Sequence, residues 1–405
     1  MTPLLRKFLG LHWILFASMI LMAAMGIYSI YGAVHFRPEP GIANQWNTQI
    51  RWALIGIVVF FGAALVDYKW IRWACLPLYV AGLGLLVLQG LKGKDTHGQV
   101  ISINIGGVSV QAAQLAVMAT ILLLGVLLGE AHKYIPWLRH YLVRFMAAGL
   151  VFAVPFALVV KQGDLGTALV MIPIVAVMLL VGNIPFRCLV AVALIGLTIL
   201  PPVFYFKLKD YQRARIQVPI DMLMGREVDV KGDGYAATNL QIGIGSAGWE
   251  GKGTDPNNLP PGQKSMLQLG LTSKSTAHTD YIFGSAAESF GFRGAAIMII
   301  GFLFMLTMCI MVSFFARDQA GRLVVAGIVG LFFAHIFEHV GMNIGIMPIT
   351  GIPLPLISYG GTFMVVNFFL LGLVQSVWVH RNAMIEEAKA KAKPKAKVVA
   401  ARALR

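Results

Sequence analysis

Residues 278–315 read HTDYIFGSAAESFGFRGAAIMIIGFLFMLTMCIMVSFF, a polar start followed by a long apolar run. Its second half, residues 294–315, has no charged side chain, and a helix needs about 20 such residues to cross a bilayer. Its first half carries His278 and Asp280 at the end of a long polar segment, where the chain enters the membrane. A carboxylate at such a boundary is partly removed from water, so its neighbours set its strength as a base. The stretch therefore predicts a membrane-spanning helix with a candidate base at its start.

Apolar runs of this kind recur along the chain. Hydrophobic residues make up 58% and charged residues 13% of its 405 residues, whereas a water-soluble domain carries about 25% charged residues. We therefore predict an all-α polytopic membrane protein with about ten transmembrane helices. The predicted spans are Leu11–Ile30, Trp52–Val66, Ile71–Leu91, Val108–Gly129, Leu142–Val160, Leu165–Val181, Cys188–Phe206, Gly294–Phe315, Leu323–Met347 and Thr362–Val379.

Lys and Arg side chains cluster at the ends of these spans and in the C-terminal tail, and the net charge is +15. This distribution follows the positive-inside rule, so we expect no nucleic acid partner and we place both termini in the cytoplasm. Two longer segments would then lie outside, Lys92–Gly107 and a large loop over about residues 207–282. We treat residues 1–385 as one membrane domain and predict that the basic tail, residues 386–405, is disordered.

Ionisable residues within or beside spans are candidates for function, because burying them is costly. Asp280 is the strongest candidate base, although a helix cap or a surface ion pair would also suit it. Asp164 would cap the span that follows it or contact a substrate. Glu288 lies eight residues after Asp280, about two helical turns, so the two could share a face; it would pair with a buried Arg or Lys, or serve as a proton or metal site. Glu338 and His339 are adjacent and point to different faces, which favours packing roles.

Two segments rich in Gly or Pro interrupt the apolar pattern. Residues 351–361 read GIPLPLISYGG and are apolar yet broken, so they form either an ordinary outer loop or a segment that lines a cavity. Gly243, Gly245 and Gly248 match a dinucleotide-binding pattern, but no strand-then-helix context surrounds them. We therefore do not interpret this second segment as a nucleotide site.

Seven short motifs, taken together, resemble the SEDS family (shape, elongation, division and sporulation). The resemblance covers about residues 10 to 385 in the family's order and is closer to its elongation branch than to its division branch. The motifs are Asp164-Leu165-Gly166-Thr167, Asp210-Tyr211-Gln212-Arg213-x-Arg215, Ile244-Gly245-Ser246-x-Gly248, Gly251-Lys252-Gly253, His278-Thr279-Asp280-Tyr281-Ile282-Phe283, Glu288-x-x-Gly291 and Gly351–Gly361.

The resemblance implies a peptidoglycan glycosyltransferase in the bacterial inner membrane. Such an enzyme polymerises lipid II, an undecaprenyl-pyrophosphate-linked disaccharide pentapeptide, on the outer face of that membrane. It works with a class B penicillin-binding protein, which is a transpeptidase, and with other membrane proteins of the elongation complex. Two alternatives stay open, a lipid-linked precursor transporter and a catalytically weak scaffold for the penicillin-binding protein.

The resemblance also implies roles for individual residues. Asp280 matches the family's essential aspartate and would act as general base. Arg213, Arg215 and Lys252 are available to neutralise the pyrophosphate leaving group, with or without a divalent cation such as Mg²⁺ or Mn²⁺. The pair Arg213 and Arg215 could equally bind lipid headgroups or the partner protein. The other positions in or beside these motifs that we assign to substrate binding are Asp164, Asn239, His278, Thr279 and Ser358.

The chain also departs from the family pattern before the fourth span. Residues 98–102 lack an Arg and a Trp that the family has there, and further on an acid is replaced by Gln114 and a base by Val117. If the missing acid and base formed an ion pair, losing both costs less than losing one.

Overall fold

The computed structural model describes residues 3–35, 37, 39–93, 102–105, 108–207, 210–226, 235–255, 257–259, 264–266, 269 and 276–381. The predicted tail, residues 386–405, lies outside these ranges. The α-helices are α1 (Pro3–Leu9), α2 (Trp13–Val34), α3 (Pro40–Ala43), α4 (Gln45–Leu65), α5 (Ile71–Lys92), α6 (Ala112–Val126), α7 (His132–Tyr134), α8 (Tyr141–Lys161), α9 (Leu165–Val181), α10 (Phe186–Lys207), α11 (Asp210–Leu223), α12 (Tyr235–Ser246), α13 (Ile282–Phe314), α14 (Gln319–Asn343) and α15 (Gly361–Val379).

Shorter elements connect these helices. Two strands, β1 (Ile103–Ile105) and β2 (Val108–Val110), form an antiparallel hairpin before α6. A π-helical turn, Leu127–Ala131, extends α6, and two 3₁₀ turns, Tyr68–Trp70 and Pro136–Arg139, precede α5 and α8. Apart from this short hairpin the described elements are helical, which confirms the helical, multi-pass architecture predicted from the sequence.

The described part of the chain contains eight helices long and apolar enough to cross a bilayer, namely α2, α4, α5, α6, α8, α13, α14 and α15. They correspond to eight of the ten predicted spans. The other two predicted spans correspond to α9, an apolar helix of 17 residues, and α10, a helix of 22 residues. A helix satisfies its own backbone groups, which is why apolar runs in lipid adopt this structure.

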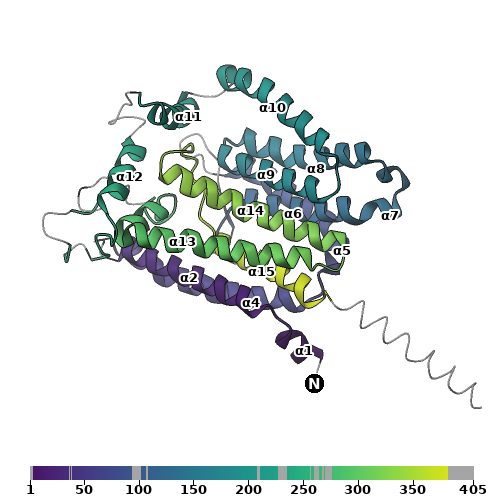
Figure 1. Ribbon diagram of the computed structural model, residues 1–405, viewed down its shortest axis with the longest axis horizontal. Helices are drawn as coiled ribbons and strands as arrows, with labels where there is room; N and C mark the ends of the chain where they lie inside the picture. The colour runs from purple at the N-terminus through teal and green to yellow at the C-terminus, as the bar shows by residue number, and fades with distance from the viewer. Residues whose placement is uncertain are drawn as a thin grey trace, which may run out of the picture.

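Helix α14 lies at the centre of the bundle, against α6, α9, α13 and α15 (Figure 1). Glycines allow this close packing, because a Cβ on Gly327 would lie 2.7 Å from Ile121 and one on Gly125 would lie 2.5 Å from Val324. On another side of the bundle, α15 packs along α4, where Gly372 lies against the backbone of Phe60. Small residues at helix contacts are typical of membrane proteins, because they let backbones approach.

A polar cluster ties helices together at one end of the bundle. Arg72 of α5 forms a bidentate ion pair with Glu130 of the π-helical turn, with two N–O distances of 2.6 Å. Asp318, which caps α14, accepts a hydrogen bond from Tyr68 at 2.9 Å. Asp280 lies at the opposite end of the bundle, which we call the Asp280 end.

Helix α13 is broken at Gly291, whose φ of 67° and ψ of −169° are not helical. Residues 248–253 lie against this break, where Lys252 N donates to Glu288 O and Phe292 N donates to Gly248 O, both at 2.9 Å. The helix begins only at Ile282, after a turn that contains Asp280. The prediction that Asp280 and Glu288 share a helix face is therefore wrong, because Asp280 precedes the helix.

Candidate functional site

The His-Thr-Asp turn is docked onto the Pro-Gly segment, residues 351–361. Ser358 Oγ donates a hydrogen bond to Thr279 O at 2.8 Å, and Tyr359 N donates one to His278 O at 3.0 Å. A Cβ built on Gly351 would lie 3.2 Å from Asp280 Oδ2, so the carboxylate lies directly against this glycine. Segment and turn together therefore form one site, although they are about 70 residues apart in the sequence.

Most of the Pro-Gly segment is inside the protein rather than on its surface. Ile352, Leu354, Leu356, Ile357 and Ser358 are each 3% exposed or less. Irregular backbone at this depth requires protein around it. The structure therefore favours a segment buried within the protein over an ordinary outer loop.

His278 is a buried, neutral member of the turn. Its side chain is 3% exposed, and its ring lies edge-on to Tyr359 with centroids 5.4 Å apart. Burial, and secondarily the charge of Arg37, lower the pKa of His278 to about 4. A neutral imidazole two residues from Asp280 adds no positive charge to the turn.

Asp164 and Glu338 flank the same Pro-Gly segment from its other side. Asp164 caps α9, accepting hydrogen bonds from Thr167 N at 3.0 Å and Thr167 Oγ1 at 2.8 Å, which confirms the predicted cap. Glu338 of α14 lies near both Thr350 and Asp164. Gly166, two residues after Asp164, packs against Thr350 and Ile352, so the start of α9 lies beside the Pro-Gly segment.

Lys252 and Glu288 form a buried ion pair beneath the break in α13. Lys252 Nζ lies 2.9 Å from Glu288 Oε1, and the two side chains are 6% and 9% exposed. Lys252 Nζ also donates to Lys264 O at 3.0 Å, and Met266 N donates to Glu288 Oε1 at 2.7 Å. The predicted pairing of Glu288 with a buried base is confirmed. The ammonium of Lys252, which we predicted to bind phosphate, is instead engaged inside the protein.

The remaining predicted ligands lie on the two helices between α10 and α13. Arg213 is exposed on α11, and Arg215 lies on the same helix. Asn239 is buried on α12, which packs against α13 and α14. Figure 1 shows α11 outside the helix bundle. The structure thus brings His278, Thr279, Ser358 and Asp280 together, and places the arginines on a separate element.

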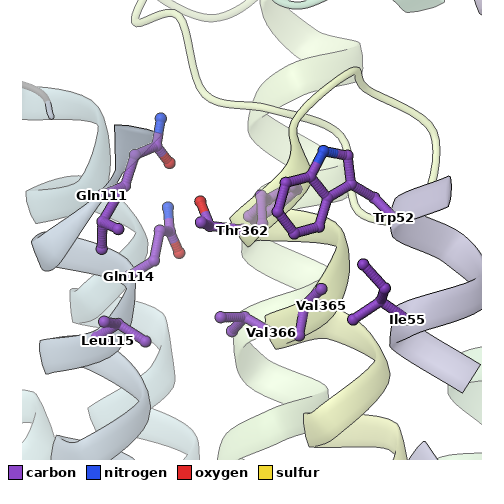
Figure 2. A pocket seen from close by; sticks show the side chains of 10 residues that line it. Trp52, Ile55, Gln111, Gln114, Leu115, Thr362, Val365 and Val366 are labelled. Carbon is purple, nitrogen blue, oxygen red and sulfur yellow. The ribbon is translucent and has the colours of Figure 1, made fainter. Parts of the chain in front are cut away.

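An apolar cavity of about 310 Å³ opens between α4, α6 and α15. Figure 2 shows Trp52 and Ile55 on one side, Leu115, Val365 and Val366 on the walls, and Gln111, Gln114 and Thr362 gathered between α6 and α15. Most of its lining residues belong to the first turns of α6 and α15, which lie at the Asp280 end. Apolar walls with a few polar groups are typical of sites for apolar ligands.

A chain of contacts joins this cavity to the Pro-Gly segment. Phe363, which lines the cavity, stacks on His335 of α14 with ring centroids 5.6 Å apart. His335 Nδ1 in turn hydrogen-bonds Pro353 O at 3.1 Å. His335 thus links the wall of the cavity to the Pro-Gly segment.

Sequence reasoning missed several polar residues that hold the site. Gln49 is fully buried, donates to Ser358 O at 3.1 Å and accepts from Gly360 N at 3.2 Å. Asn343 donates to Asp280 O at 3.2 Å and accepts from Gly284 N at 3.0 Å. The available signal was an amide side chain within or beside an apolar run, where a polar group needs a partner.

Apolar helices of membrane-spanning length, with a carboxylate held at one end beside a buried broken segment, define a multi-pass membrane protein. Residues 11–383 match the cell cycle protein family of FtsW, RodA and SpoVE. The chain therefore belongs to this family, which confirms the resemblance found in the sequence.

Individual relatives agree with the family assignment. The chain is 26% identical over 445 residues to peptidoglycan glycosyltransferase RodA of Treponema pallidum (strain Nichols), with 90% of this chain and 96% of the relative covered. It is 29% identical over 368 residues to peptidoglycan glycosyltransferase MrdB of Escherichia coli (strain K12), with 91% and 92% covered.

Solved structures show the same fold. One of them comes from work on the structural coordination of polymerization and crosslinking by a peptidoglycan synthase complex. It matches with a TM-score of 0.73 at 25% identity, and the match covers 92% of this chain and 98% of that chain. Rod shape determining protein RodA of Thermus thermophilus matches with a TM-score of 0.64 at 23% identity, covering 92% and 97%.

Proposed function

We propose that this protein is a peptidoglycan glycosyltransferase that polymerises lipid II into glycan strands for cell elongation, with Asp280 as general base. Its family and its relatives, which are named glycosyltransferases, support the activity. The observation that carries the proposal is the placement of Asp280. Its carboxylate lies against Gly351 in a turn anchored by buried hydrogen bonds, at the end of a membrane-spanning bundle.

The chemistry requires a base at one atom and a stabilised leaving group at another. An acceptor sugar hydroxyl attacks C1 of the donor sugar, its proton passes to the Asp280 carboxylate, and the new O–C1 bond forms. The bond from C1 to the pyrophosphate oxygen breaks, and its electron pair leaves with the pyrophosphate. Arg213 and Arg215 on α11 are the cationic side chains that we propose to neutralise that charge.

A divalent cation, Mg²⁺ or Mn²⁺, enters this proposal only as an ion carried by the pyrophosphate. Among the described residues, no group of three His, Cys, Asp or Glu side chains could hold a metal ion. Ions such as Mg²⁺ commonly bind through substrate phosphates and only one or two carboxylates.

The apolar cavity between α4, α6 and α15 suits part of the lipid carrier. Its walls are apolar, as a hydrocarbon chain requires, and the amide groups of Gln111 and Gln114 are uncharged, so a hydrocarbon chain in the cavity would not have to desolvate a charge. We propose that the cavity takes a portion of the undecaprenyl chain while the sugars lie beside Asp280.

The setting in the cell is part of the same proposal. We place the protein in a bacterial inner membrane with the Asp280 end outside and both termini in the cytoplasm, following the distribution of Lys and Arg. We propose a class B penicillin-binding protein and other elongation-complex membrane proteins as partners, and the match to a peptidoglycan synthase complex supports the first of these. An intact Asp280 site favours the polymerase over a scaffold or a transporter.

The test is polymerisation of purified lipid II by the purified protein with a class B partner, with and without Mg²⁺ or Mn²⁺. Wild type should form glycan strands and Asp280→Ala should not. Asp67→Asn is the matched control, because Asp67 lies at the opposite end of the bundle, where it caps a 3₁₀ turn. No product from a folded, partner-bound wild type would favour the scaffold. Equal product from wild type and Asp280→Ala would remove Asp280 from the mechanism.

A further inference from the structure

Helix α14 carries a row of buried polar side chains that face the site. His335, His339 and Asn343 follow one another at intervals of four residues, so they lie on one face of the helix. They are 1%, 0% and 0% exposed. Polar groups this deeply buried require hydrogen-bond partners, and all three find them near Asp280.

The three side chains bond to two backbone segments. His335 Nδ1 lies 3.1 Å from Pro353 O, and His339 Nδ1 lies 2.6 Å from Ile352 O. Asn343 Nδ2 donates to Asp280 O at 3.2 Å and to His339 O at 2.8 Å. One helix therefore holds both the turn that carries Asp280 and the segment that covers it.

The identity of the acceptors settles which ring nitrogen of His339 acts. A carbonyl oxygen only accepts, so Nδ1 of His339 must carry the hydrogen. The other nitrogen, Nε2, is buried without a hydrogen-bond partner. The contribution of His339 to the site is therefore one N–H group at one position on the ring.

That N–H group holds the residue next to Gly351. Gly351 has a φ of 74°, and a Cβ on it would lie 3.2 Å from Asp280 Oδ2. On the far side, Gly166 of α9 lies against Ile352, where a Cβ would approach its Cγ1 to 2.7 Å. The segment is confined between α9 and α14, and the Asp280 carboxylate lies at its edge. A shift of Ile352 would therefore move the surface against which the base rests.

We propose that His339 is a positioning residue, whose Nδ1–H bond to Ile352 O fixes Gly351 against the Asp280 carboxylate and so orients the base. This inference rests on the proposed function for its effect on rate. Its structural part, that His339 orders residues 350–353, is measurable without any activity. A residue that only filled space could be replaced by any side chain of similar size, whereas this role requires a donor at the Nδ1 position.

The test compares three substitutions of His339. In His339→Asn the amide NH₂ occupies the place of Nδ1–H, in His339→Gln it occupies the place of Nε2, and in His339→Leu there is no donor. Turnover at saturating lipid II should stay within about threefold of wild type for Asn and fall by about 10²-fold for Gln and Leu, since small misplacements cost this much. The lipid II concentration at half-maximal rate should change by less than about twofold, because no substrate contact is lost.

Hydrogen–deuterium exchange supplies the second measurement. The peptide covering residues 348–357 should exchange faster in the Gln and Leu variants than in wild type and the Asn variant. The matched control is His380→Leu, which removes a buried histidine that also bonds a backbone carbonyl, Ser376 O at 2.9 Å, at the opposite end of the bundle. It should leave exchange at residues 348–357 unchanged.

The outcomes separate this inference from the proposed function. Equal exchange and equal turnover in the Asn, Gln and Leu variants would overturn the positioning role while leaving the glycosyltransferase intact. Wild type without product would overturn the proposed function, and the exchange ranking would still decide whether His339 orders the segment. Should the Leu variant not fold, the comparison of Asn with Gln decides, because both keep a polar amide.

Discussion

The buried pair Lys252–Glu288 should behave as a coupled unit. Lys252 Nζ lies 2.9 Å from Glu288 Oε1, with the side chains 6% and 9% exposed. The informative changes are Lys252→Met, which keeps the length of the side chain without its charge, and Glu288→Gln, which keeps an oxygen for Met266 N. Each single change leaves one buried group without its opposite charge, and the double change leaves none.

The expected magnitudes follow from the cost of an unpaired buried charge. Removing one partner of a buried pair costs about 3–5 kcal/mol. Glu288→Gln preserves the acceptor for Met266 N. We therefore expect a loss in the free energy of unfolding at the lower end of this range, about 3 kcal/mol, for each single variant. The double variant should lose about 3 kcal/mol rather than about 6 kcal/mol, which gives a coupling energy of about 3 kcal/mol.

Equilibrium unfolding in mixed micelles, at one fixed detergent composition, would measure this cycle. The matched control is the pair Arg226–Asp221, whose atoms lie 3.2 Å apart but whose side chains are 60% and 20% exposed. That exposed pair should show a coupling energy below about 1 kcal/mol. If the two Lys252–Glu288 single variants add up to the double variant, the argument that this pair is held by its charges is refuted.

Three further perturbations test other parts of the structure. Gly291→Ala should destabilise the protein by at least about 2 kcal/mol, because Gly291 has a φ of 67° and a Cβ on it would meet the backbone of residues 249–251. In the same unfolding assay, Gly149→Ala should be neutral or slightly stabilising, because Gly149 lies in helix α8 with open space around it. Arg72→Ala should cost about 1–3 kcal/mol by leaving buried Glu130 unpaired, reduced because Arg72 is 36% exposed, and a loss below about 0.5 kcal/mol would contradict this. The pKa of His278 is about 4 in the folded protein and 6.5 in the unfolded chain, so the unfolded state binds more protons between these two pH values. The free energy of unfolding should therefore fall by about 2 kcal/mol from pH 7 to pH 5. This loss should disappear in His278→Gln.

Much of the fold was predictable because lipid allows few structures. Uncharged runs of span length predicted helices, since a helix in lipid must satisfy its own backbone groups. Asp164 before an apolar run predicted a cap, and its carboxylate does accept from Thr167 N at 3.0 Å. Glu288, an acid beside an apolar run, predicted a buried Arg or Lys partner, and Lys252 is that partner. These successes concern local patterns or the cost of burying a charge, and both can be judged from nearby sequence.

The arrangement of the site was less predictable because it depends on contacts between distant segments. The helical spacing of Asp280 and Glu288 was misleading, because Thr276 O accepts from Thr279 N at 3.2 Å and Tyr281 N at 3.1 Å, and so closes a turn before the helix starts. Nothing near Gln49 indicates that it would bond to Ser358, which lies 309 residues away. The identity of such partners follows from packing in three dimensions.

The departures from the family pattern become coherent when they are placed in the structure. Gln114, which replaces an acid, is 7% exposed and lines the apolar cavity, while Val117, which replaces a base, is 2% exposed within the main hydrophobic core. A single remaining charge at either position would be buried in apolar surroundings without a partner, at a cost of several kcal/mol. With both absent, α6 presents a neutral wall that packs against α14. The neutral wall suits an uncharged chain. The Asp280 site is built from the His-Thr-Asp turn, α14 and the Pro-Gly segment, to which Gln114 and Val117 do not belong.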